Sequence, residues 1–358
     1  MPKISQTAVL GLVVTERSNS QRPQRHSQRV LKDWGYIYPT SFPKQVDPPY
    51  LLGRAINAHV IDYELVKSWI QFCTDYHTDP CTQIIRTKSL PFDFRVIDCS
   101  TRKVIQAQDH CQYVAMSYVW GLKDKDPTKH KVCRETGKMP DDLPAVIDDA
   151  ITVVLGLGLQ FLWVDRYCIR QDDEEDMRMQ IPWMATIYAN ACITIIAAAG
   201  KDSSFGLPGV GRPRKEQPTI QVGHQTLVCT LPDPHHIIGS STWMTRGWVY
   251  QEALFSRRRL IFSPDQIYFE CNNMQCYESI HHPLNVIHTK DLSRLRSCIR
   301  QGIFRGGFGE RRWPLSTHIV NFTSKLLTYE KDKLFAMLGI YKAFQEQMNP
   351  VHVVFGVP

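Results

Sequence analysis

Three short, almost continuous apolar runs dominate the hydrophobic pattern of the chain. They span Tyr113–Trp120, Phe161–Asp165 and Cys192–Ala199. Each run has the length of a β-strand, and unbroken apolar character is typical of strands buried on both faces of a parallel sheet. Between the first two runs, apolar residues recur at helical spacing over Leu143–Leu157. This alternation of strand and helix predicts an α/β fold in which helices cross over between parallel strands.

The crossover before the third run has two distinctive features. It opens with the acidic run Asp172–Asp176, which is typical of a solvated loop and also suits the positive N-terminal end of a helix. Helical spacing follows from Met177 to Tyr188, but Pro182 interrupts it. Because proline removes a backbone donor and clashes with the preceding turn, we expect either a kink or a helix that begins there.

Further elements are predicted on the carboxyl-terminal side. Thr245–Leu254 has the pattern of a short helix, and Arg259–Ser263 and Gln266–Cys271 flank a Pro-Asp pair as the two strands of a hairpin. Residues 316–347 are helical again, and we expect a break at Gly339.

On the amino-terminal side, residues 60–85 have helical spacing and Phe92–Cys99 is predicted as a strand. Together the patterns divide the 358 residues into five segments. These are a disordered basic arm (1–48), an extension with a helix and a strand (49–112), the α/β core (113–271) with an insertion rich in Gly, Pro and His (200–242), a basic irregular linker (272–313) and a helical segment (314–358).

The net charge of +7 is unevenly distributed. Residues 1–32 and residues 290–313 each carry a net charge of +5, so the remainder is mildly acidic. The chain has no helix-turn-helix, zinc-finger or RNP pattern, and this argues against a nucleic-acid partner. Only the aromatic residues interleaved with the second basic cluster, Phe304, Phe308 and Trp313, keep that alternative open.

The 11 cysteines are scattered and form no C-x-x-C pair. An odd number without a dense framework favours the reducing cytoplasm over a disulfide-bonded secreted protein. No apolar run reaches the roughly 18–20 residues that a membrane span needs. We therefore predict a cytoplasmic protein that does not enter the membrane.

One cysteine grouping has a spacing compatible with a metal. Cys73, His77 and Cys81 share one face if the segment is helical, and a fourth ligand would have to come from elsewhere, for example Cys99. The alternative is half-buried cysteines beside a surface histidine, which we favour because the usual C-x-x-C knuckle is missing. A weaker cluster of the same kind comprises Cys271, Cys276, His281 and His282.

Candidate catalytic side chains gather near the carboxyl ends of the predicted strands, where ligands bind in open α/β sheets. Ser117 and Trp120 end the first strand, and Asp165 ends the second as either a ligand group or a structural cap. Glu252 follows Trp248 by one helical turn, so the indole can desolvate the carboxyl and tune its proton affinity. The structural alternative is a core tryptophan beside a glutamate that pairs with Arg246 or Arg257.

Five blocks follow one another along the chain: YVAMSYVWG (113–121), LPAVIDDAI (143–151), FLWVDRYCIRQDDEED (161–176), MATIYANACITIIAA (184–198) and TRGWVYQEALFSRRRLIF (245–262). Together they resemble fungal heterokaryon-incompatibility (HET) domain proteins. Standard signatures such as the P-loop, H-E-x-x-H and G-x-S-x-G do not occur. The chain departs from the usual HET pattern at Met116, at Arg166-Tyr167 and at Pro182.

The resemblance implies a role in fungal non-self recognition that triggers programmed cell death. The order of elements is similar to that of Toll/interleukin-1-receptor (TIR) domains, which implies a flavodoxin-like parallel sheet with a helical C-terminal segment added. Enzymatic TIR domains carry a catalytic Glu four residues after a Trp, on the helix that follows the third strand. Trp248 and Glu252 have this spacing, but only after the insertion at 200–242.

Two functional hypotheses follow from the resemblance. In the first, the protein is an NAD+ nucleosidase with Glu252 as the catalytic carboxylate. NAD+ is then the substrate, no cofactor is tightly bound, and the residues that bind NAD+ are Ser117, Trp120, Asp165, Arg246 and Trp248. In the second, the domain is a non-enzymatic TIR-like module that signals by self-association and by contact with an incompatibility partner protein of unknown identity.

Overall fold

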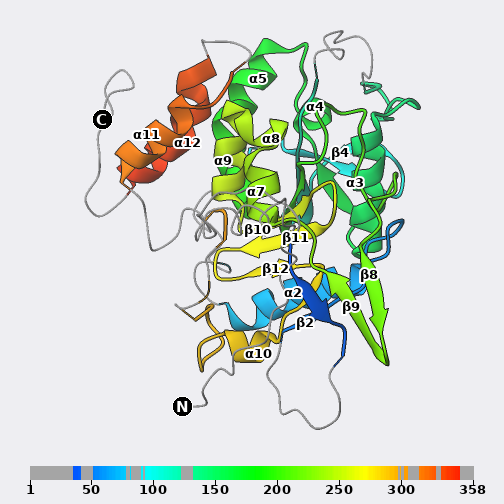
Figure 1. Ribbon diagram of the computed structural model, residues 1–358. Helices are drawn as coiled ribbons and strands as arrows, with labels where there is room; N and C mark the ends of the chain where they lie inside the picture. The colour runs from blue at the N-terminus through cyan, green and yellow to red at the C-terminus, as the bar shows by residue number, and fades with distance from the viewer. Residues whose placement is uncertain are drawn as a thin grey trace, which may run out of the picture.

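A mixed eight-stranded sheet forms the centre of the computed structural model (Figure 1). The structure describes residues 35–41, 51–77, 81, 90–91, 93–121, 132–296, 299, 302–304, 314–327 and 332–346. Within them the strand order is β12-β11-β10-β7-β5-β6-β3-β4. The bounds are β3 Arg95–Asp98, β4 Lys103–Gln106, β5 Tyr113–Ser117, β6 Phe161–Trp163, β7 Ile193–Ala197, β10 Arg258–Phe262, β11 Ile267–Cys271 and β12 Gln275–Tyr277.

The four central strands β6, β5, β7 and β10 are parallel, and the outer strands are antiparallel to their neighbours. Every residue of β5, β7 and β10 is buried, as continuous apolar runs require. Ile195 of β7 is in register with Met116 of β5 on one side and with Leu260 of β10 on the other. The prediction of an α/β fold with parallel central strands is therefore confirmed, as is the hairpin, which β10 and β11 form.

Helices connect the parallel strands and pack on the sheet. Figure 1 shows α9 above strands β10 to β12 and α2 below them. The bounds are α2 Tyr63–Tyr76, α3 Ala145–Gly156, α4 Asp165–Cys168, α5 Glu174–Gln180, the 3₁₀ turn η1 Ile181–Trp183, α6 Met184–Asn190, α7 Pro234–Gly239, α8 Thr242–Thr245, α9 Gly247–Phe255, α10 Leu284–Ile287, α11 Leu315–Thr323 and α12 Lys333–Gln345. No helix in the described ranges is both long and apolar enough to cross a bilayer.

The segments around the core also contain strands. Within the predicted extension, β3 and β4 belong to the main sheet, and within the predicted linker β12 does so too. The insertion at 200–242 contributes β8 Thr219–Val222 and β9 Gln225–Cys229, which form a second sheet with β1 Ile37–Pro39. A third, two-stranded sheet pairs β2 Leu52–Gly53 with β13 Ile280–His281. Most of the predicted basic arm, 1–48, lies outside the described residues.

The acidic run at 172–176 is only partly the solvated loop that its composition predicts. Asp173 caps α5 by accepting the backbone N–H groups of Glu175 and Asp176, both at 3.1 Å. Asp176 is buried and accepts a hydrogen bond of 2.5 Å from Arg95 of β3. The prediction of a solvated loop is therefore wrong for Asp176, because the buried guanidinium of Arg95 compensates its negative charge. The interruption predicted at Pro182 is confirmed, since η1 separates α5 from α6.

Helix α12 runs through Gly339 without the predicted break. A Cβ atom at this position would lie 2.5 Å from Ala185 Cβ and 2.7 Å from Gln251 Oε1. The glycine therefore lets α12 approach α6 and α9 closely, and its backbone N–H donates to Gln251 Oε1 at 2.9 Å. The break lies instead in the stretch between α11 and α12.

Substitution of Gly339 by alanine is expected to destabilise the fold by about 1–3 kcal/mol, because the added methyl group overpacks this contact. Urea unfolding measures the change. The matched control is Gly239→Ala in α7, where no heavy atom lies within 4 Å of the added methyl group. If Gly339→Ala lowers the free energy of unfolding no more than the control does, α12 is not closely packed at this position.

Candidate active site

Residues predicted to carry the chemistry converge at the carboxyl end of β5. This strand lies between β6 and β7, and the chain runs from β5 to β6 before it returns to β7. The connections therefore diverge on either side of β5, which is the place where open α/β sheets form a ligand crevice. Ser117 is the last residue of β5, and α9 packs against this strand with Glu252 on its inner side.

Glu252 is a buried carboxyl with several polar neighbours. Its side chain is only 5% exposed, and Oε2 accepts a hydrogen bond of 2.5 Å from Ser117 Oγ. Ser117 Oγ in turn accepts the indole N–H of Trp243 at 2.8 Å. The Tyr188 hydroxyl lies within hydrogen-bonding reach of Glu252 and donates to the Met116 carbonyl at 3.0 Å. These contacts hold the carboxyl in one orientation beneath the end of the sheet.

Asp165 is the second carboxyl of the site. The sequence predicted it at the end of a strand, but β6 ends at Trp163 and Asp165 begins α4. Its two oxygens accept the Trp120 indole N–H at 3.1 and 3.3 Å, and Oδ1 also accepts the backbone N–H of Arg166 at 2.7 Å. The guanidinium of Arg166 lies 5.4 Å from the centre of the Trp120 ring. Asp165 is therefore the first residue of α4 and not its cap, which is Val164, and its role as a ligand group stays a prediction.

The environment raises the proton affinity of both carboxyls. Burial, followed by the negative charge of Asp165, raises the pKa of Glu252 to about 7 against the hydrogen bond from Ser117 and the charge of Arg246. Burial also raises the pKa of Asp165 to about 6, against the Arg166 N–H and the charge of Arg246. Between these two pH values the pair holds about one proton, so one carboxyl is charged while the other is neutral.

Arg246 and Trp248 flank the pair at the start of α9. Arg246 precedes the helix in an extended conformation and donates from Nη1 to the Tyr118 carbonyl at 2.8 Å. Trp248 is half-buried against the main core, and its predicted role beside Glu252 stays a prediction. Arg257 is not the partner of Glu252, because its guanidinium donates to the carbonyls of Asn190 and Ala191.

Two residues of the site were not predicted from the sequence: Tyr188 and Trp243. Tyr188 was assigned to an apolar helical face, although a buried tyrosine needs a partner for its hydroxyl and so signals a polar site. Trp243 follows the predicted insertion, and nothing in its spacing connects it to Ser117. Only the fold brings α8 against the end of β5.

The match to known families falls on this site. Residues 113–252 match the model of the family described as "Heterokaryon incompatibility protein (HET)". This region is a HET domain. The match begins with β5, ends at Glu252 and includes all six predicted site residues, and it confirms the resemblance found in the sequence. Comparison with curated proteins and with solved structures gives no match.

A HET domain implies a role in heterokaryon incompatibility and the associated cell death. Chemically, the carboxyl pair of this HET domain can take up and release a proton near neutral pH and can face a developing positive charge. Trp120, Asp165 and Arg246 are partly exposed and form the rim of the site, whereas Ser117 and Glu252 lie buried below them.

The metal ligands suggested by the sequence lie outside the HET domain. The structure places Cys73, His77 and Cys81 together with Cys271, and not with Cys99. This is the one group of three or more His, Cys, Asp or Glu side chains with metal-binding geometry in the described part of the chain. The weaker cluster proposed around Cys271 does not form, because Cys276, His281 and His282 are not part of that group.

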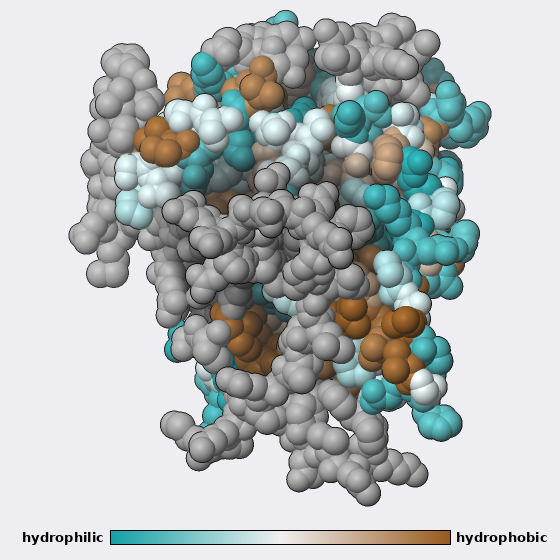
Figure 2. Space-filling view, viewed as in Figure 1, coloured by the Kyte–Doolittle hydropathy of each residue, from teal (hydrophilic) through white to brown (hydrophobic). Residues whose placement is uncertain are grey.

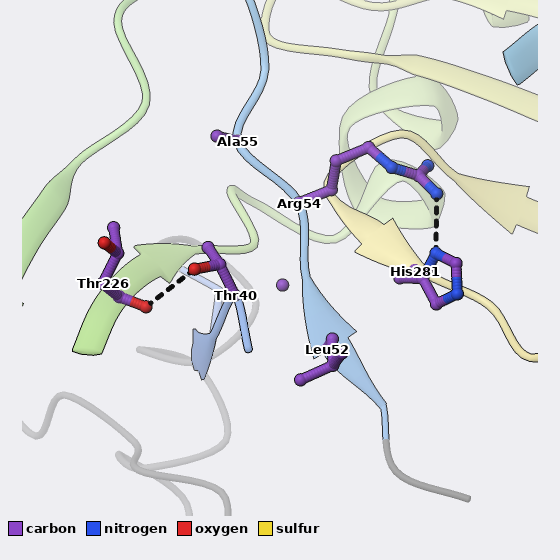
Figure 3. A pocket seen from close by; sticks show the side chains of 7 residues that line it. Thr40, Leu52, Arg54, Ala55, Thr226 and His281 are labelled. Carbon is purple, nitrogen blue, oxygen red and sulfur yellow. Dashed lines mark hydrogen bonds between the residues drawn. The ribbon is translucent and has the colours of Figure 1, made fainter. Parts of the chain in front are cut away.

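A separate pocket of about 480 Å³ also lies away from the HET site (Figure 3). In it the Arg54 guanidinium contacts Nδ1 of His281 at 3.1 Å, and Thr40 Oγ1 donates to the Thr226 carbonyl at 3.3 Å. None of the predicted catalytic or NAD+-binding residues lines this pocket.

Proposed function

We propose that the HET domain is a cell-death effector that hydrolyses the bond between nicotinamide and ribose in NAD+. The observation that carries the proposal is the buried carboxyl of Glu252, which Ser117 holds at the carboxyl end of β5. The charge of Asp165 adds to burial in raising the pKa of Glu252. Glu252 is the catalytic carboxylate, and Asp165, Arg246 and Trp120 bind and orient the substrate.

The chemistry of this bond matches what the pair offers. Nicotinamide leaves NAD+ as a neutral base, so the leaving group needs no proton, and positive charge develops on the ribose ring as in other glycoside hydrolyses. An ionised Glu252 stabilises that charge. Water then attacks the anomeric carbon and gives its proton to a carboxylate of the pair. The products are nicotinamide, ADP-ribose and one proton.

The rim residues suit the rest of a dinucleotide. The partly exposed ring of Trp120 offers a stacking surface, and Arg246 offers a cation for the pyrophosphate. Ser117 has a positioning role, because its hydroxyl fixes the orientation of Glu252. Trp248 is assigned here as a further wall for a ring, on the strength of its place one turn before Glu252.

The order of the parallel strands adds support. The order β6-β5-β7-β10 corresponds to chain order 2-1-3-4, which is the beginning of the flavodoxin-like order 2-1-3-4-5. This is the strand order expected for a flavodoxin-like or TIR-like sheet. Flavodoxin-like folds bind their ligand beside the first strand, and β5 is the first parallel strand of this protein. The antiparallel β11 occupies the fifth position in this protein.

Self-association is the second candidate function, and a specific observation favours it. Helices α11 and α12 and the segment that follows α11 carry exposed apolar side chains, and Figure 2 shows brown surface at the position of the two helices. Helix α12 also packs on α9, which carries Glu252. Because Glu252 is only 5% exposed, we propose that assembly through this surface opens the rim. The exposed residues are Val320, Leu326, Leu334 and Phe335.

The test is incubation of the purified full chain with NAD+, with nicotinamide followed by chromatography over a range of protein concentrations. We expect nicotinamide and ADP-ribose in equal amounts, with a specific activity that rises as the protein assembles. Assembly without turnover would favour the non-enzymatic module. Turnover that does not depend on protein concentration would refute activation by assembly.

A further inference from the structure

We propose that Cys73, His77, Cys81 and Cys271 bind one zinc ion in a structural site. Their candidate ligand atoms, three sulfurs and one imidazole nitrogen, all lie within 4.8 Å of one another, and all four side chains are buried. None of the three cysteines forms a disulfide. Three thiols and an imidazole are a common ligand set of closed tetrahedral zinc sites.

The distances suit a tetrahedral ion. With a Zn–S bond of about 2.3 Å and a Zn–N bond of about 2.0 Å, neighbouring ligand atoms are separated by roughly 3.5–3.8 Å. Cys271 Sγ lies 3.3 Å from His77 Nδ1, close to this separation. Small shifts of side chains therefore bring the four atoms to the distances that zinc requires.

The fold explains why distant residues meet at this point. Cys73 lies in the last turn of α2, and His77 caps the helix with its backbone N–H on the Cys73 carbonyl. Helix α2 packs on β11 through Trp69 and Phe269, whose ring centres are 5.9 Å apart. Cys271 ends β11, so this packing carries it to the end of α2.

A chain of hydrogen bonds fixes His77 as a ligand through Nδ1. His288 Nδ1 lies 2.6 Å from the Leu284 carbonyl and must donate to it. In a neutral His288, Nε2 is then an acceptor, and it lies 3.3 Å from His77 Nε2, which must therefore carry a proton. This leaves the lone pair of His77 on Nδ1, directed at Cys271. Metal-bound histidines have such an outer partner for the other ring nitrogen.

The charge of the site is also compensated. A zinc ion with three thiolates and one imidazole carries a net charge of −1, which is costly to bury without a cation. Arg258 is buried and donates from Nε to Cys73 Sγ at 3.1 Å. The guanidinium therefore supplies the missing charge.

Four protein ligands leave no open position, so the ion would stabilise structure rather than catalyse. It would join the end of α2 to the end of β11, and through His288 to α10. All four ligands lie outside residues 113–252. The inference is therefore independent of NAD+ cleavage, and either proposal can fail alone.

The test measures metal in the full chain, expressed with zinc and purified under reducing conditions without chelator. Mass spectrometry of the metal is expected to find about one zinc ion per chain, and Cys271→Ser is expected to lose most of it. Cys276→Ser, a buried cysteine outside the cluster, is the matched control and is expected to keep the metal. A folded wild-type chain that binds no zinc, or a Cys271→Ser variant with as much zinc as the control, would overturn the proposal.

A second measurement serves if Cys271→Ser does not fold. Wild-type protein reconstituted with Co²⁺ is expected to show the visible bands of a tetrahedral ion and a thiolate charge-transfer band. His77→Cys is expected to keep the ion and strengthen the charge-transfer band, because a fourth thiolate replaces the imidazole. An octahedral cobalt spectrum without thiolate bands would mean that Co²⁺ binds elsewhere, and it would overturn the proposal.

Discussion

Replacement of Glu252 by glutamine is expected to slow NAD+ hydrolysis by about 10³-fold, within the range for removal of a catalytic charge or base. The amide keeps the shape of the side chain and an oxygen that accepts the Ser117 hydroxyl. It cannot become an anion, so it can neither stabilise positive charge on the ribose nor accept the proton of water. The rate of nicotinamide release at saturating NAD+ measures the effect.

The matched control for this change is Asp265→Asn. Burial also raises the pKa of Asp265, and this residue lies in the turn between β10 and β11, two strands along the sheet from β5. We expect its activity to equal that of the wild type, with both variants giving circular dichroism spectra of the folded chain. Wild-type turnover in Glu252→Gln would remove Glu252 from the mechanism.

The second large effect concerns stability and pH. The pKa of Glu252 is raised from 4.5 to about 7 in the folded chain, mainly by burial. The folded state therefore holds a proton that the unfolded chain releases above its own pKa. The stabilising contribution is complete below the unfolded pKa and is lost as pH rises through the folded pKa. The free energy of unfolding should fall by up to about 3 kcal/mol between pH 4.5 and pH 8 from this group.

Glu252→Gln removes this dependence and should be more stable than the wild type at pH 8 by a similar amount. Urea unfolding at pH 5 and pH 8 for both proteins measures the difference. Because Asp165 also has a raised pKa, some decline with pH should persist in the variant. Parallel curves for the two proteins would contradict a buried Glu252 that titrates near neutrality.

Local patterns predicted the central part of the fold well. The apolar runs at Tyr113–Trp120 and Cys192–Ala199 became β5 and β7 because a strand buried on both faces leaves a clear signal. The two edge strands of the sheet, β4 and β12, left no such signal in the sequence. Strand β4 has no fully buried residue, and β12 has only three residues, so neither stands out from a loop in the sequence.

Prediction of the two sites from the sequence was limited mainly by contacts between residues that lie far apart along the chain. The sequence placed Ser117 correctly at a strand end and Glu252 on a helix, whereas Asp165 lies two residues beyond the strand that it was predicted to end. Trp243 meets Ser117 across 126 positions, and Cys271 meets His77 across 194. Both pairings depend on how α8 and α2 pack on the sheet, which spacing along the chain does not encode. The sequence therefore offered Cys99 as the fourth metal ligand where the fold supplies Cys271.

The most direct test of the proposed function is a single-turnover experiment with the full chain in excess over NAD+. The mixture is quenched over time, and nicotinamide, ADP-ribose and remaining NAD+ are quantified by mass spectrometry for wild type and Glu252→Gln side by side. We expect the wild type to convert NAD+ to equal amounts of nicotinamide and ADP-ribose, and the variant to leave NAD+ intact. Intact NAD+ with assembled wild-type protein, or equal conversion by both proteins, would contradict the proposed function.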